Sequence, residues 1–113
     1  MIQYNCIVQE NHVPESLRAQ LVSALTRVTT DVLGTPAGEI QVHFREIPSG
    51  AGYRGGELST TSLVRGTMPP GCEQTVREKL LESICEMWCE VTGCGDDEVV
   101  VSAADADYVP KVF

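Results

Sequence analysis

The chain has 113 residues, of which 42% are hydrophobic, and a formal net charge of −8. This length predicts one domain, small enough for oligomerisation to add to its stability. Only eight residues are Lys or Arg, so we expect no basic face for nucleic acid, and no apolar run is long enough to predict a membrane span. The first residues lack the basic and apolar regions of a secretion signal, which favours a cytoplasmic protein with reduced cysteines.

The sequence contains two copies of one pattern, displaced by 59 positions. A fixed period of this length predicts one supersecondary unit used twice, because neither copy buries its apolar face alone. We place the copies at about 1–47 and 60–106, joined by a Gly-rich link at 48–59, with Met1 and Ile2 matching Thr60 and Thr61. Further matched pairs are Arg18 with Arg77, Leu21 with Leu80, Gly34 with Gly93, Glu39 with Glu98, and Ile40 with Val99.

The first copy predicts a strand, a helix and a second strand in that order. Residues 2–8 are a short β-prone run. From Pro14 onward, apolar residues recur at helical spacing until Gly34, which is a natural helix stop. Ile40, Val42 and Phe44 then alternate with polar residues, which is typical of a strand with one buried face.

The second copy repeats this order, with a strand over 60–66, a helix over 73–91, a last strand over 99–103 and a tail over 105–113. Two such units predict an α+β fold, in which a four-stranded sheet carries both helices on one face. The strands within each unit are expected to be parallel, because a helix connects them in a right-handed crossover. The other face of the sheet needs cover, and a symmetric oligomer is the simplest cover.

The cysteines and acidic groups give no metal motif. Cys85 and Cys89 are one helical turn apart and Cys94 follows soon after, but no nearby His or fourth Cys completes a zinc tetrahedron. We interpret them as ordinary helix cysteines and expect no metal. The Gly-rich link precedes a strand rather than a helix, so it is no phosphate loop, and no organic cofactor is expected.

The element order, together with the segment 40–50 (IQVHFREIPSG) and the loop 55–58 (GGEL), resembles the tautomerase superfamily. The residue match is closest to 4-oxalocrotonate tautomerase (4-OT). Two units in one chain are more similar to the cis-3-chloroacrylic acid dehalogenase and malonate semialdehyde decarboxylase branches. The resemblance implies the β-α-β tautomerase fold, a small-molecule substrate and a homotrimer that covers the bare sheet face.

Family chemistry depends on an N-terminal proline whose amine acts as general base or acid. Ile2 stands at the matching position, and a bulky residue there is expected to prevent removal of Met1. The catalytic candidate is then the primary α-amine of Met1, one residue upstream. An α-amine in a water-poor site suits a general base near neutral pH. The alternative is an ordinary terminus that starts a strand.

The resemblance also places substrate-contacting residues. His12 and Gln41 stand where 4-OT has arginines that hold carboxylates, and Cys72 stands where the dehalogenase branch has one. His12 is a candidate for substrate contact or acid–base catalysis across a subunit interface, and the alternative is an exposed histidine. Gln41 offers hydrogen bonds but no charge, which weakens a carboxylate grip. Cys72 is either a pocket residue or a small apolar packing group.

Three more residues complete the candidate set. Tyr53 adjoins Gly52, which matches the aromatic residue of the family link, and is either a catalytic candidate as a donor to an enolate oxygen or a residue that caps the link. Arg65 is a remaining cation near the expected pocket mouth, and Tyr108 in the tail is either a proton donor over the pocket or a packing residue. His43 is expected to be a hydrogen-bonded sheet residue at the trimer centre.

The sequence supports three functional hypotheses. The first is a tautomerase-like isomerase acting on a small enolisable molecule that is neutral or carries one carboxylate, because few cations remain to bind charge. The second is a non-catalytic binding or structural trimer on the same scaffold, since a fold does not fix a function. The third is a lyase, hydratase or decarboxylase that uses the same pocket.

Overall fold

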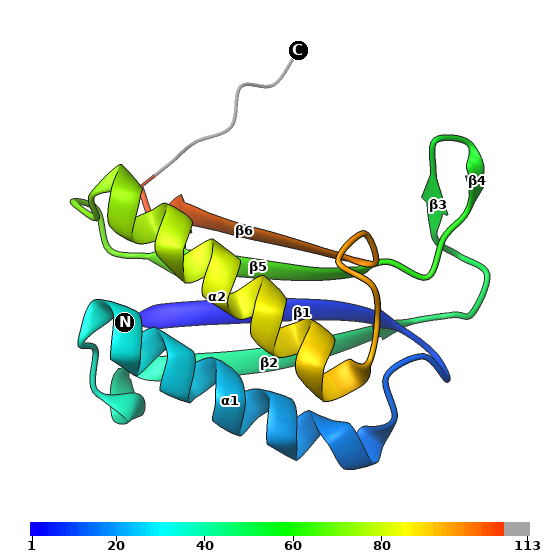
Figure 1. The fold of residues 1–113 in the computed structure, drawn as a ribbon, viewed down its shortest axis with the longest axis horizontal. Coiled ribbons are helices and arrows are strands. Elements are labelled where there is room, and N and C mark those ends of the chain that lie inside the picture. Colours follow the sequence, from blue (N-terminus) through cyan, green and yellow to red (C-terminus); the bar gives the residue numbers. More distant parts are fainter. Residues whose placement is uncertain (108–113) are drawn as a thin grey trace.

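Two βαβ units form one four-stranded sheet (Figure 1). The structure, a computed structural model, describes residues 1–107. The first unit consists of β1 (Ile2–Gln9), α1 (Glu15–Leu33), the 3₁₀ turn η1 (Ala37–Glu39) and β2 (Ile40–Ile47). The second consists of β5 (Ser62–Met68), α2 (Gln74–Thr92) and β6 (Val99–Asp105), and the link between the units contains the hairpin of β3 (Tyr53–Arg54) and β4 (Glu57–Leu58).

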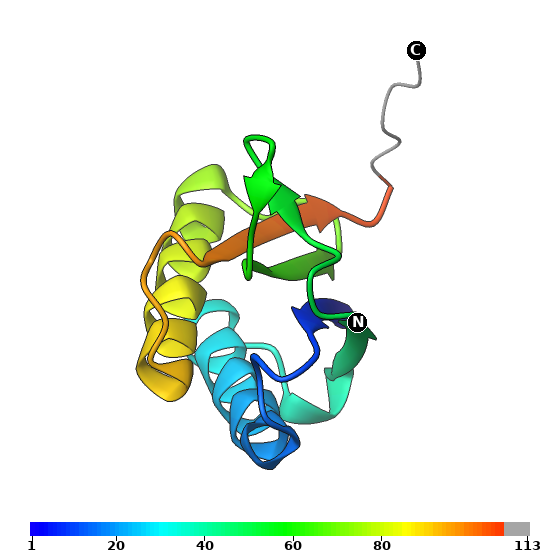
Figure 2. The ribbon, with the colours of Figure 1, turned by 90° about the vertical axis from the view of Figure 1, so that its right-hand side faces the viewer.

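The strand order is β2-β1-β5-β6, with parallel pairs β1–β2 and β5–β6 on the outside. In the middle, β1 and β5 pair antiparallel. Both helices lie on the same side of the sheet (Figure 2). The predicted α+β architecture, with two helices on one face of a four-stranded sheet, is therefore confirmed. None of the helices in residues 1–107 is both long and apolar enough to span a bilayer.

Each long helix ends at a glycine in the left-handed conformation. Gly34 has a φ of 72° and Gly93 a φ of 76°, a region that glycine enters without steric cost. Their backbone N–H groups donate to the carbonyl oxygens of Thr30 and Cys89, each at 2.8 Å. The two helix ends therefore have the same capping geometry at positions 59 residues apart.

The core lies between the helices and the sheet. The Tyr4 hydroxyl lies 2.8 Å from the Thr29 hydroxyl, so this buried polar group has a partner. The Trp88 ring stacks on Phe44 with centroids 6.5 Å apart, which joins α2 to β2 in the other unit. Among the most deeply buried side chains are Tyr4, Val8, Leu21, Leu25, Val64, Leu80, Ile84 and Trp88.

The structure corrects the match between the first strands of the two units. Ile2 pairs with Ile40, and Ser62 pairs with Val99, so Ser62 is the equivalent of Ile2. The offset is therefore 60 for the first strands and 59 for the helices and last strands, and Thr61 is not the equivalent of Ile2. In a strand a shift of one residue moves every side chain to the opposite face. The second unit compensates with a connection from strand to helix that is one residue shorter.

Some element bounds also differ from the prediction. β5 begins at Ser62 rather than residue 60, and β6 continues to Asp105, the residue at which the sequence pattern starts the tail. The β3–β4 hairpin was not predicted, because two-residue strands in a Gly-rich segment carry no detectable alternation. Its glycines have positive φ at Gly55 and Gly56, which permits the tight turn.

An ion pair is repeated in the two units. Arg18 Nη2 lies 2.5 Å from Glu46 Oε2, and Arg77 Nη2 lies 2.5 Å from Asp105 Oδ1. Arg18 corresponds to Arg77, and Glu46 corresponds to Asp105, at the 59-residue offset. Arg77 also donates through Nη1 to the carbonyl oxygen of Ala103 at 3.3 Å. Each helix is thus joined near its start to the second strand of its own unit.

The uncovered face of the sheet is polar in its middle. There Asn5 of β1 has His43 on one side and Arg65 on the other, and Arg65 is in register with Ser102. The next row across the strands is apolar except for Arg45 and consists of Arg45, Ile7, Leu63 and Val100. Strand alternation assigns fourteen side chains to this face, none of them acidic: Gln3, Asn5, Ile7, Gln9, Gln41, His43, Arg45, Ile47, Leu63, Arg65, Thr67, Val100, Ser102 and Ala104.

Gly66 is predicted to be intolerant of a side chain. A Cβ at this position would lie 2.9 Å from Cε1 of the buried Tyr4 ring and 3.3 Å from the Ser102 carbonyl oxygen. Overpacking of this kind costs about 1–3 kcal/mol, so Gly66→Ala should lower the free energy of unfolding by that amount in urea denaturation. The control is Gly38→Ala, where a Cβ meets no atom within 4 Å. Equal effects of the two substitutions would contradict the close contact at Gly66.

Candidate active site

A cavity opens at the end of the sheet where β1 begins. It has a volume of about 400 Å³. The end of α1, the start of α2 and the end of β5 all lie at this end of the molecule (Figure 1). The lining is mainly apolar and contains no Lys, Arg or His among the described residues; it consists of Ile2, Val32, Leu33, Thr35, Met68, Pro69, Cys72, Glu73 and Val76.

Ile2 and Met1 have opposite environments. Ile2 is 2% exposed and its side chain lines the cavity, whereas Met1 is 62% exposed. A weak contact joins Gln3 Nε2 to the Met1 sulfur at 3.9 Å. The buried Ile2 side chain therefore anchors the start of β1, and the backbone nitrogen of Met1 lies one residue from that anchor.

Cys72 and Glu73 form the start of α2 at the cavity wall. The Cys72 thiol is half-buried and lies 3.6 Å from the Glu73 carbonyl oxygen. Glu73 precedes the first helical residue, and its side chain makes no capping hydrogen bond. Free N–H groups and the helix dipole at this end favour negative charge beside Cys72. Cys72 was predicted, whereas Glu73 and Thr35 were not.

Two predicted residues lie on the opposite side of the sheet. Gln41 is in register with Gln3, and Arg65 is in register with Asn5, and all four are exposed on the uncovered face. The cavity is lined by Ile2 and Met68, which face the helices. Within one protomer, Gln41 and Arg65 therefore do not reach the cavity.

His12 and Tyr53 lie at the other end of β1. The eight-residue strand is about 23 Å long at the usual rise, so these side chains are far from Met1. His12 is exposed and borders an open hollow of about 200 Å³. Tyr53 borders a hollow of about 260 Å³. Tyr108 lies outside the described residues.

The position of Tyr53 depends on a buried glutamine. Gln9 is 2% exposed, and its Nε2 donates to the Ser59 carbonyl oxygen while its Oε1 accepts from the Gly50 N–H at 3.4 Å. These bonds tie the end of β1 to both sides of the Gly-rich link. Gly52 approaches the Gln9 amide so closely that a Cβ at this position would overlap Nε2. Position 52 therefore holds a glycine for a steric reason.

Two core groups away from this cavity have raised pKa values. Burial raises the pKa of the Cys6 thiol to about 12. Burial also raises the pKa of Tyr4, against the lowering effect of its hydrogen bond with Thr29. Both side chains are fully buried in the core, where the neutral form is favoured because water is absent. We assign these two groups to the packing of the core.

No protein-family model matches the sequence, and no curated protein matches it. Solved structures do. The crystal structure of native Ps01740 is 28% identical, with a TM-score of 0.87, and covers 96% of this chain and 99% of that chain. A fused 4-OT, solved as a symmetric trimer, is 17% identical with a TM-score of 0.84 over 91% of this chain and 84% of that chain. N1, a member of the cis-3-chloroacrylic acid dehalogenase family, is 20% identical with a TM-score of 0.87 over 91% of this chain and 73% of that chain.

The molecule is thus an α+β protein of two tandem βαβ units with an apolar cavity at the start of its first strand. Its fold is that of the tautomerase superfamily, as the sequence resemblance implied.

The shifted pKa of Cys6 predicts a pH-dependent stability. The native state favours the neutral thiol, whereas the unfolded chain ionises it above its ordinary value of 9.0. The stabilisation is therefore complete below pH 9 and is lost as pH rises from 9 toward 12. Between about pH 8 and pH 10, the advantage of the native protein over Cys6→Ala in free energy of unfolding should shrink by roughly 1 kcal/mol.

Urea titrations at several pH values measure this difference. Val64→Ala is the control, because it truncates another fully buried side chain on the neighbouring strand without removing a titratable group. A difference between native protein and Cys6→Ala that stays constant up to pH 10 would contradict the assignment.

Proposed function

We propose that this protein is a tautomerase-like isomerase that moves a proton between carbon and oxygen of a small enolisable molecule, such as a 2-oxo acid. The observation that carries the proposal is the apolar cavity at the start of β1, on a fold shared with a fused 4-OT. The described lining contains no cation, so the substrate is neutral or carries one carboxylate. We place the reaction in the cytoplasm and without a cofactor.

The α-amino group of Met1 is the proposed base. Ile2 is buried and holds the start of β1 in place, which keeps the preceding amine near the cavity mouth. Cys72, at the start of α2, is proposed to contact the substrate oxygen on which charge develops. Stabilising such charge usually lowers the barrier more than any other single effect in catalysis of this kind.

The other predicted site residues require a homotrimer. His12 and Tyr53 are about one strand length from Met1 in the same chain, and Gln41 and Arg65 lie on the uncovered sheet face. We propose that three chains assemble with this face covered, so that His12 and Tyr53 of one chain approach the cavity of a neighbour. The absence of acidic side chains on the described face supports the association of chains that each carry a charge of −8.

A second candidate is favoured by the side chain at position 2. Ile2 occupies the place of the family proline and is buried, so a binding or structural trimer without catalysis is the alternative. The cavity would then hold a small apolar ligand. A lyase, hydratase or decarboxylase reaction in the same cavity is the remaining alternative.

The enzyme proposal predicts that acetylation of Met1 abolishes enol ketonisation. The assay follows the ultraviolet absorbance of phenylenolpyruvate and 2-hydroxymuconate, with intact mass confirming that Met1 is present. The chain has two lysines, so the double variant Lys79→Arg and Lys111→Arg confines acetylation to the α-amine. Loss of the proposed base should lower kcat at least about 100-fold. Glu82→Ala, an exposed change on α2, serves as the control.

Survival of activity after acetylation would move the base to a side chain, and His12→Ala is then the deciding variant. If neither enol reacts with the unmodified protein, the isomerase proposal fails for these substrates. The non-catalytic binding or structural trimer is then the favoured function.

The shared site predicts complementation between defective chains. Met1-acetylated protein and His12→Ala protein are each expected to be inactive. When they are dissociated in mild denaturant and reassembled together, a fraction of sites combines an intact Met1 with an intact His12, so activity should return. Sedimentation should give three times the chain mass for every sample. A monomer, or a mixture no more active than its parts, would contradict a site shared between chains.

A further inference from the structure

Two thiols are in contact at the end of α2. Cys89 lies in the last turn of the helix and Cys94 lies just beyond it, with their sulfur atoms 3.7 Å apart. Both side chains are half-buried. A disulfide bond is about 2.05 Å long, so these are unbonded sulfurs that need a movement of less than about 2 Å to bond.

The helix cap fixes this contact. Gly93 has left-handed backbone angles, and its N–H donates to the Cys89 carbonyl oxygen at 2.8 Å. In this type of helix end, the residue after the glycine packs against the residue whose carbonyl is capped. Cys94 is therefore directed onto Cys89 by the backbone.

The first unit provides an internal comparison. At the end of α1, Gly34 has the same conformation and caps Thr30, and the Thr30 hydroxyl donates to the Thr35 carbonyl oxygen at 2.9 Å. Thr30 and Thr35 are the equivalents of Cys89 and Cys94 at the 59-residue offset. The same backbone geometry thus carries two hydroxyls in one unit and two thiols in the other.

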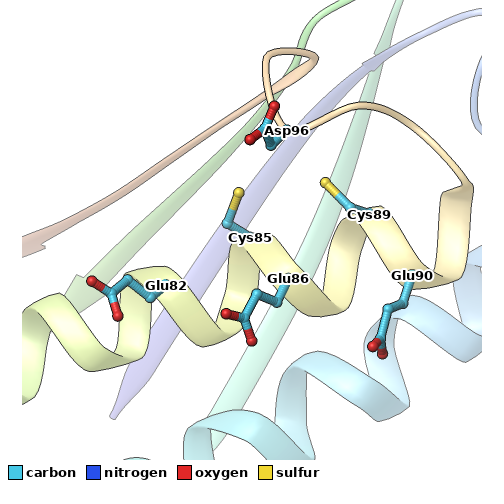
Figure 3. A pocket seen from close by; sticks show the side chains of 6 residues that line it. All are labelled: Glu82, Cys85, Glu86, Cys89, Glu90 and Asp96. Carbon is cyan, nitrogen blue, oxygen red and sulfur yellow. The ribbon is translucent and has the colours of Figure 1, made fainter.

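One thiol of the pair, that of Cys89, is accessible from an open cavity. Cys89 borders an open cavity of about 480 Å³, lined by Glu82, Cys85, Glu86, Cys89, Glu90 and Asp96. Figure 3 shows Cys85 and Cys89 pointing from α2 toward the loop that carries Asp96, while Glu86 and Glu90 point away from that loop. A small oxidant can therefore reach Cys89 without unfolding of the helix.

We propose that Cys89 and Cys94 form an oxidation site, which closes to a reversible intramolecular disulfide in the presence of a peroxide. One thiolate attacks a peroxide oxygen, the O–O bond breaks, and a sulfenic acid and one water form. The second thiol then attacks the sulfenic sulfur and displaces the second water. Two thiols lose two hydrogens in total, and hydrogen peroxide is reduced to two waters.

The environment of Cys89 keeps its thiol neutral. Burial, together with the neighbouring thiols of Cys94 and Cys85, raises the pKa of Cys89 to about 12. Cys89 is therefore a protonated thiol near neutral pH and a poor attacking group. Because the two sulfur atoms are already in contact, either thiol can resolve a sulfenic acid formed on the other.

The test treats the full-length protein with hydrogen peroxide, blocks the remaining thiols and cleaves after glutamate. Cleavage after Glu86 and Glu90 separates all three cysteines of this region into different peptides. A Cys89–Cys94 disulfide keeps two of these peptides joined, with an intact-mass loss of about 2 Da that dithiothreitol reverses. Cys89→Ser and Cys94→Ser should each abolish the joined peptides, and Cys85→Ser and Cys72→Ser should leave their yield unchanged.

A matched variant tests the role of the helix cap. Thr30→Cys combined with Thr35→Cys places thiols at the equivalent end of α1 and should gain a second disulfide under the same conditions. Native protein in which Cys89 and Cys94 become sulfinic acids without joining would overturn the proposal. A joined pair that contains Cys85 in place of either partner would overturn it as well.

Discussion

The antiparallel pairing of β1 with β5 determines the rest of the architecture. Each βαβ unit has a helix on one side of two strands and an apolar surface too small to bury by itself. When β1 and β5 join, the two strand pairs become one sheet, both helices come to the same face, and a single core forms between α1, α2 and the sheet. Gly66 is needed at this junction, because its strand partner Tyr4 occupies the space where a side chain would be. The packing of the junction thus depends on a glycine in one strand and a large aromatic residue in the other.

The same pairing positions the cavity. Because β1 and β5 run in opposite directions, the start of β1 lies beside the end of β5, where the chain turns into α2. The end of α1 arrives at the same place. Ile2, Leu33 and Met68 therefore meet although they come from three separate parts of the sequence. The pseudo-symmetry of the fold creates a second hollow at the far end of the sheet, where His12 lies beside the start of β5. Different residues line the two hollows, so the two differ in chemistry.

Sequence patterns were sufficient for the order and type of the main elements, because apolar residues alternate or recur along them and Gly34 and Gly93 mark the helix ends. The first strands were matched one residue out of register, since Ile2 and Ser62 share no side-chain chemistry and only pairing with Ile40 and Val99 reveals their equivalence. Only some of the residues that line the cavity could be predicted from the sequence. Cys72 follows from the resemblance, whereas Glu73 and Thr35 line the cavity through three-dimensional packing that no local pattern encodes. The contact between Cys89 and Cys94 could not be predicted from the sequence either, because it depends on the geometry of the helix cap.

The pairing pattern has a consequence for how the chain folds. Parallel partners such as Ile2 and Ile40, or Ser62 and Val99, are more than thirty residues apart, and the junction joins Gln3 to Thr67 across more than sixty. Every strand contact of the main sheet is therefore distant in sequence, and long loops must close before the sheet contributes stability. The ion pairs Arg18–Glu46 and Arg77–Asp105 each join residues 28 positions apart within one unit. They favour an order of events in which each half assembles on its own helix and the two halves then dock along β1 and β5.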